Sequence, residues 1–142
     1  MNDVYELGNL SRLRSLVDKW QAEHPGPTVV TLNGDFVSPS ILSSMDKGFA
    51  MVDCMNAVGI THCCFGNHEQ DVGHKHLQRR IQQYQGMWLN SNIPSYPAQM
   101  AEYAIVDVGA HKVGLIGLLT DEAGVFRDNT FRGYAIEPVS GI

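Results

Sequence analysis

The sequence has 142 residues, of which 44% are hydrophobic and 18% are charged, and its formal net charge is -5. This length and balance are typical of one globular domain with one core and exclude a disordered chain. The negative charge argues against a broad basic surface for a nucleic-acid polymer. No apolar run approaches the roughly 20 residues that span a bilayer, and the N-terminus lacks the basic and apolar regions of a signal peptide.

The three cysteines are Cys54, Cys63 and Cys64. Their number is odd and no CxxC pair is present, so the sequence indicates neither a disulfide framework nor a structural zinc site. Reduced thiols inside a core are the simplest interpretation. Together with the lack of a signal peptide, they favour a cytoplasmic location without a membrane partner.

Short apolar, β-branched runs alternate with helical patterns along the chain. The expected elements are a helix over residues 10–20, a strand over 28–32, a helix over 45–58, a strand over 61–65, a helix over 77–84, a strand over 87–92, and a hairpin of strands 102–108 and 113–119 joined by the four residues GAHK. Strands that alternate with helices predict an α/β fold with a mostly parallel central sheet and flanking helices. The late hairpin adds an antiparallel pair at the far side.

Polar side chains follow two neighbouring strands where each strand ends. Asp35 follows the run 28–32 within NGD, and Asn67 and His68 follow the run 61–65 within FGNHEQD. In open α/β sheets, ligands bind beyond the carboxyl ends of the strands. If the two strands are parallel, these side chains emerge at one edge and share one site.

The residue types in this pattern suit a metal and phosphate site. A carboxylate directly after a glycine can bridge two cations, and the amide of Asn67 offers a neutral oxygen that preserves positive charge on the metals. His68 can protonate a leaving oxygen, with Asp71 holding the imidazole by a hydrogen bond. Each motif alone is better explained structurally, with Asp35 in a turn or cap and Asn67 as a helix N-cap. Their occurrence after consecutive strands favours the site.

The stretches NGDFVSPS (33–40) and FGNHEQD (65–71) resemble the calcineurin-like metallophosphoesterase superfamily, and in particular its 5'-nucleotidase branch with the signatures GD-x-x-x-x-S and GNHE-x-D. The resemblance extends to MVDCMNAVGITHCCF, WLNSNI and VGLIGLLTDE, so it spans the chain. It implies an αββα sandwich, two divalent metal ions (Zn, Mn, Fe or Mg) and hydrolysis of a phosphomonoester, such as a nucleotide, by metal-activated water.

The resemblance also implies roles for particular residues. Asp3 matches a metal ligand, Asp35 the ligand that bridges both metals and Asn67 a ligand of the second metal. His68 and Asp71 match the catalytic dyad. Asn92, at the end of the third expected strand, is expected to line the substrate pocket.

The sequence departs from the family pattern in two ways. The family motif D-x-H has Tyr5 in place of its histidine, and a packed aromatic at the edge of the site is the preferred interpretation of that residue. The later histidine and the GHxH motif that complete the family's metal site are absent. We therefore expect residues 1–142 to be the N-terminal half of a catalytic domain, with sheet surface left uncovered and a tendency to self-associate.

Two other classes of function remain open from the sequence. Tyr5 and the absent histidines favour a truncated or degenerate, non-catalytic remnant that binds a metal or a partner protein. A thiol-based function rests only on the adjacent Cys63 and Cys64.

Overall fold

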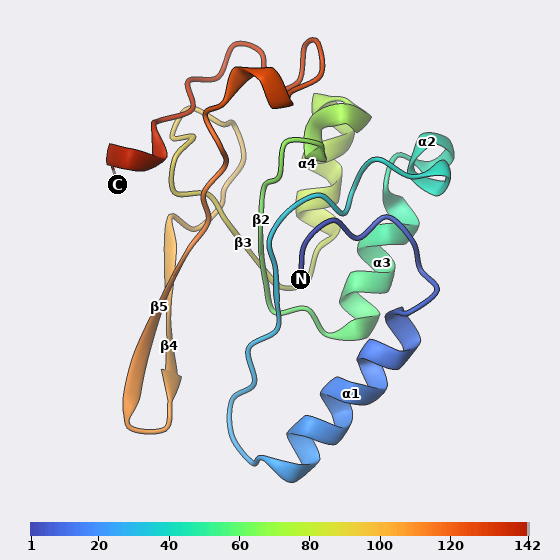
Figure 1. The fold of residues 1–142 in the computed structure, drawn as a ribbon, viewed down its shortest axis with the longest axis vertical. Helices are drawn as coiled ribbons and strands as arrows, with labels where there is room; N and C mark the ends of the chain where they lie inside the picture. Colours follow the sequence, from blue (N-terminus) through green and yellow to red (C-terminus); the bar gives the residue numbers. More distant parts are fainter. Residues whose placement is uncertain (142) are drawn as a thin grey trace.

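The computed structural model describes residues 1–141 and contains one parallel sheet, one antiparallel hairpin and four α-helices (Figure 1). In chain order the elements are α1 (Leu10–Glu23), β1 (Thr31–Leu32), α2 (Ile41–Asp46), α3 (Phe49–Val58), β2 (His62–Cys64), the 3₁₀ helix η1 (Glu69–Val72), α4 (His74–Gln83), β3 (Met87–Leu89), β4 (Tyr103–Val108), β5 (His111–Ile116) and the 3₁₀ helices η2 (Ala123–Val125) and η3 (Val139–Gly141).

The central sheet has the order β1-β2-β3, and all its strands are parallel. Thr31 pairs with His62, and His62 pairs with Met87. The predicted parallel α/β arrangement is therefore confirmed, although each strand is shorter than its apolar run. Helices α1 to α4 lie to one side of these strands in Figure 1 and the β4–β5 hairpin lies to the other.

The helix expected over 45–58 is two helices, and this prediction was wrong in its detail. Lys47 and Gly48 both adopt the left-handed conformation, with φ of 58° and 78°, and end α2 before α3 begins. Because of this break, Met45 is 79% exposed, whereas Met51, Val52, Met55 and Val58 of α3 are buried. Ser40 caps α2 by accepting a hydrogen bond from the Ser43 N–H at 2.9 Å.

The hairpin is tighter than the sequence indicated. Strands β4 and β5 pair from Tyr103 with Ile116 to Val108 with His111, so the connection is two residues and not the four of GAHK. Gly109 takes the left-handed conformation (φ 61°) that such a short turn requires.

Within residues 1–141, no helix combines the length and the apolar character needed to cross a membrane.

Candidate active site at the carboxyl edge of the sheet

The loops that follow β1 and β2 approach each other at two glycines. A Cβ on Gly34 would collide with the backbone of Gly66, and a Cβ on Gly66 would collide with Asp35. Asp35 itself adopts the left-handed conformation with φ of 55°. The glycines therefore allow the two loops to touch at the carboxyl edge of the sheet, which brings Asp35 beside the Asn67–His68 pair as predicted.

A buried carboxylate, that of Glu69, holds these two loops together. Its Oε2 accepts hydrogen bonds from the N–H groups of Asp35 (2.8 Å) and Gly66, and its Oε1 accepts from Phe36 (2.8 Å) and Val37 (3.3 Å). The side chain is fully buried, and this desolvation raises the pKa of Glu69 to about 7 against the opposing effect of the backbone donors. Sequence reasoning gave Glu69 no role. The only signal was its place in GNHE, which does not reveal that the side chain points inward.

The carboxylates of Asp3 and Asp35 meet around the hydroxyl of Tyr5. The Tyr5 hydroxyl donates to Asp3 Oδ1 at 2.5 Å and lies 3.5 Å from Asp35 Oδ2. The segment is fixed by the backbone, because Val4 N–H donates to the Asp35 carbonyl at 2.9 Å. Desolvation, the hydrogen bond to Asp3 and the nearby carboxylates raise the pKa of Tyr5, so the phenol remains protonated and acts as a donor.

The half-buried position of Asp35 makes its negative charge unfavourable. Burial raises the pKa of this carboxyl group, and the charge of Asp3 acts in the same direction, whereas the His68 backbone N–H, which donates to Asp35 Oδ1 at 2.9 Å, opposes it. A bound cation would relieve this accumulation of negative charge.

His68 and Asp71 form the expected pair. His68 Nδ1 lies 2.8 Å from Asp71 Oδ2, and only 3% of the Asp71 side chain is exposed. A carboxylate can only accept, so Nδ1 carries the proton and donates it. The other ring nitrogen, Nε2, has no hydrogen-bond partner within the described part of the chain.

The side-chain amide of Asn67 is oriented by a distant segment. Its Nδ2 donates to the carbonyl of Val125 at 2.8 Å. Because a carbonyl cannot donate, the amide nitrogen must face Val125, which leaves Oδ1 for a cation.

Asn92 is not at the site, and this expectation was wrong. The strand expected to run to residue 92 ends at Leu89, and Asn92 is fully buried after it. Its side-chain amide forms hydrogen bonds with backbone groups. Nδ2 donates to the carbonyls of Leu119 (2.7 Å) and Glu137 (3.0 Å), and Oδ1 accepts from the Leu119 N–H (2.9 Å). Asn92 therefore fixes the path of the chain after the hairpin.

The donor set of the site meets the needs of a divalent cation in part. Asp3, Asp35 and Asn67 offer oxygen ligands, which suit hard divalent ions. Residues 1–141 contain no cluster of three or more His, Cys, Asp and Glu side chains placed to hold a metal. The described residues thus fit the oxygen part of a metal site and lack the imidazoles of a mixed set.

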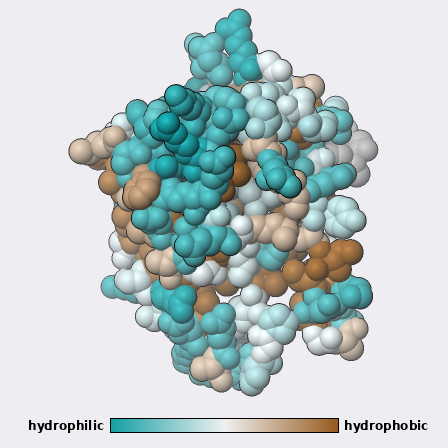
Figure 2. Space-filling view, turned by 180° about the vertical axis from the view of Figure 1, so that it is seen from behind, coloured by the Kyte–Doolittle hydropathy of each residue, from teal (hydrophilic) through white to brown (hydrophobic). Residues whose placement is uncertain are grey.

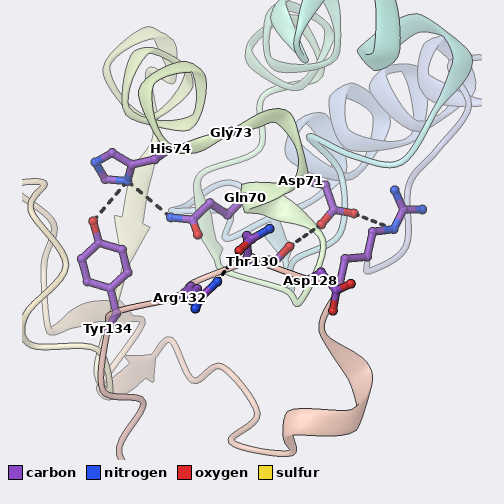
Figure 3. A pocket seen from close by; sticks show the side chains of 10 residues that line it. Gln70, Asp71, Gly73, His74, Asp128, Thr130, Arg132 and Tyr134 are labelled. Atoms are coloured by element: carbon purple, nitrogen blue, oxygen red, sulfur yellow. Dashed lines mark hydrogen bonds and ion pairs between the residues drawn. The ribbon is translucent and has the colours of Figure 1, made fainter.

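A polar cavity of about 320 Å³ adjoins the dyad (Figure 3). Its walls come from the end of η1, the start of α4 and the segment 127–134. Figure 3 shows Thr130 pointing toward Asp71, and Gln70 and Tyr134 pointing toward His74. No pattern in the sequence connects this late segment with the site.

The cysteines do not show the chemistry of reactive thiols. Burial raises the pKa of Cys63 well above its usual value and that of Cys64 to about 11. Both thiols therefore stay protonated near neutral pH, and a thiolate-based function gains no support.

A parallel α/β sheet with acidic, amide and imidazole groups gathered at its carboxyl edge is an arrangement that suits metal-assisted hydrolysis. The family model described as calcineurin-like phosphoesterase matches residues 1–133, and the chain belongs to this family. Members of the family generally use divalent metals.

Relatives by sequence and by structure agree with this assignment. The chain is 29% identical over 129 residues to the snake venom 5'-nucleotidase of Gloydius brevicauda, covering 83% of this chain and 21% of that protein. It is similar to a 5'-nucleotidase precursor from Thermus thermophilus (TM-score 0.67, 26% identity, 78% of this chain and 23% of that one). The fold also matches the sulfate thiohydrolase SoxB of Thermus thermophilus (TM-score 0.77, 23% identity, 94% and 25%). The chain thus spans about a fifth to a quarter of the length of these relatives.

Proposed function

We propose that this protein takes part in metal-dependent hydrolysis of a phosphomonoester and that its substrate is a nucleotide. The observation that carries the proposal is the convergence of Asp35 and the Asn67–His68 pair at one edge of the sheet, where the Asp35 carboxylate accepts the His68 N–H. The 5'-nucleotidase relatives support the choice of substrate. We further propose that residues 1–142 form the N-terminal half of the metallophosphoesterase domain.

Each candidate residue is assigned a role as a metal ligand or as a general acid. Asp35 is proposed as the bridging ligand, with Asp3 and the Oδ1 atom of Asn67 as the other oxygen ligands. Divalent cations bound by these oxygen ligands would supply Lewis acidity for activating water and for offsetting the phosphoryl charge. His68 is proposed as the acid at the leaving oxygen through Nε2, because Asp71 occupies Nδ1 and fixes the ring.

The test is hydrolysis of p-nitrophenyl phosphate and adenosine monophosphate by the intact protein, with Mn²⁺, with Zn²⁺ and with a chelator. We expect turnover of both substrates with metal and none in chelator. A protein that binds Mn²⁺ but hydrolyses neither substrate would favour the non-catalytic remnant, for which the shortage of His, Cys, Asp and Glu clusters in residues 1–141 is the supporting observation.

We also propose that the hairpin associates with a second copy of the chain. Tyr103, Ile105 and Ile116 share one face of the hairpin by their pairing and are 60%, 59% and 58% exposed. Figure 2 shows hydrophobic side chains at the surface on the side where the hairpin lies, next to hydrophilic ones. An apolar ribbon with unpaired strand edges can pair with an identical ribbon.

Replacing Ile105 by Lys is expected to shift the protein toward the monomer, because a charge would be buried in the contact. Sedimentation velocity at several concentrations measures the change. Ile41→Lys is the matched control, since Ile41 is 86% exposed but lies on α2. A wild-type protein that stays monomeric at all concentrations would refute the proposal.

A further inference from the structure

The segment 125–131, here termed the clamp segment, contacts three residues of the GNHEQD motif, at positions 67, 70 and 71. Asn67 Nδ2 donates to the Val125 carbonyl, and the Phe131 N–H donates to Gln70 Oε1. Thr130 Oγ1 donates to Asp71 Oδ1 at 2.9 Å. A stretch about sixty residues away in sequence therefore holds the groups proposed as ligand and dyad.

The clamp segment is anchored to the core by an aromatic side chain. Phe131 is buried and packs on Phe65, with ring centroids 5.3 Å apart, and on Tyr96 at 6.0 Å. Phe65 is also the last residue before the Gly66 turn. The same core side chain therefore packs against the clamp segment and precedes the loop that carries Asn67 and His68. Asn129 and Phe131 both have positive φ (71° and 53°), so the segment turns sharply on each side of Thr130.

Asp71 has more partners than its pairing with His68 requires. Its Oδ2 faces His68 Nδ1 at 2.8 Å and the Arg127 Nε at 3.2 Å, while its Oδ1 accepts from Thr130. Both oxygens are thus held, and the plane of the carboxylate is fixed. A carboxylate without the Thr130 hydroxyl could rotate and leave the imidazole in more than one orientation.

We propose that Thr130 and Arg127 are positioning residues that hold Asp71, and through it His68, in the orientation needed for general-acid catalysis. This inference rests on the proposed function, since it assigns the clamp segment to the same site. Thr130 fixes the direction of the carboxylate, and Arg127 balances its charge from the exposed side. Neither residue needs to touch the substrate for this role.

The test compares Thr130→Val, which removes the hydroxyl and keeps the volume, with Thr130→Ser, which keeps the hydroxyl. The assay uses the intact protein with Mn²⁺. We expect Thr130→Val to lower kcat for adenosine monophosphate about tenfold with KM unchanged, because an alcohol leaving group depends on protonation. With p-nitrophenyl phosphate, whose leaving group needs little protonation, the loss should stay below about twofold.

Thr130→Ser should restore kcat for the nucleotide, and Thr120→Val should behave as wild type, since Thr120 lies outside the clamp segment. Equal losses of activity on both substrates would show a general structural effect and overturn the proposal. So would an unchanged kcat of Thr130→Val on the nucleotide.

A second measurement separates failure of this inference from failure of the proposed function. The Nδ1–H proton of His68 is observable by NMR when its hydrogen bond to Asp71 protects it from exchange. We expect this signal in the wild type and in Thr130→Ser, and its loss by exchange in Thr130→Val. The NMR result stands even if neither the wild type nor any variant hydrolyses a phosphate ester. Persistence of the Nδ1–H signal in Thr130→Val would then overturn the positioning role, and loss of this signal would support it.

Discussion

Asp35→Asn is expected to reduce metal-dependent phosphate hydrolysis by at least about a thousandfold, which corresponds to roughly 4 kcal/mol of transition-state stabilisation. Asn tolerates the left-handed backbone at this position (φ 55°), and its Oδ1 can still accept the His68 N–H. The substitution therefore removes one negative charge and little else. A neutral amide is a poor bridge between two cations.

Two measurements check this result. Turnover of p-nitrophenyl phosphate with Mn²⁺ reports catalysis, and calorimetric titration with Mn²⁺ reports affinity for the metal, which should fall as well. Asp107→Asn is the matched control, because Asp107 is exposed and pairs only with Lys112 among the residues described. Unchanged turnover in Asp35→Asn, with Asp107→Asn also active, would refute the bridging role.

The candidate site could be predicted from the sequence where it depends on sheet topology. Two apolar runs that end at glycine turns specify two strands, and parallel pairing brings Asp35 and His68 to one edge whatever the exact lengths of the strands. The His68–Asp71 contact is local, because three positions in one turn are within reach of each other. These features needed no knowledge of tertiary packing.

Asn92 shows where this reasoning fails. Its assignment depended on strand length, and β3 ends three residues earlier, at Leu89. Once the strand has ended, the direction of a side chain no longer follows the alternation of the sheet. Asn92 turns inward and binds the backbone of Leu119 and Glu137, a contact that no local pattern specifies.

The clamp segment was missed for a related reason. It lies largely outside regular structure, so it has no hydrophobic period to detect. The contacts that connect the clamp segment with the site are long-range; Thr130 and Asp71, for example, are 59 positions apart in the sequence. Side-chain contacts of this range appear only once the fold is known. Tyr5 is a similar case, since its hydroxyl, expected only at the edge of the site, lies between the carboxylates of Asp3 and Asp35.

Glu69→Gln is expected to destabilise the folded protein by roughly 3 kcal/mol, or about 10 °C in Tm. Each carboxylate oxygen of Glu69 accepts hydrogen bonds from two backbone N–H groups. Three of these four donors lie in the loop after β1, and the fourth is Gly66. Glutamine has one oxygen, so in either orientation its NH₂ group faces two N–H donors that it cannot satisfy. Because Glu69 is fully buried, water cannot replace the lost acceptor without opening the loops.

Thermal unfolding followed by circular dichroism measures the effect, with Glu102→Gln as the control because Glu102 is exposed. The same substitution at Glu102 should leave Tm within about 1 °C of the wild type, since surface changes alter stability little. The loss of the Glu69 hydrogen bonds should also disturb the geometry of the site. The carboxylate joins the loop that carries Asp35 to the turn that carries Asn67 and His68. A Glu69→Gln protein that melts with the wild type would show that the two loops are held together by the sheet alone, and that the carboxylate does not link them.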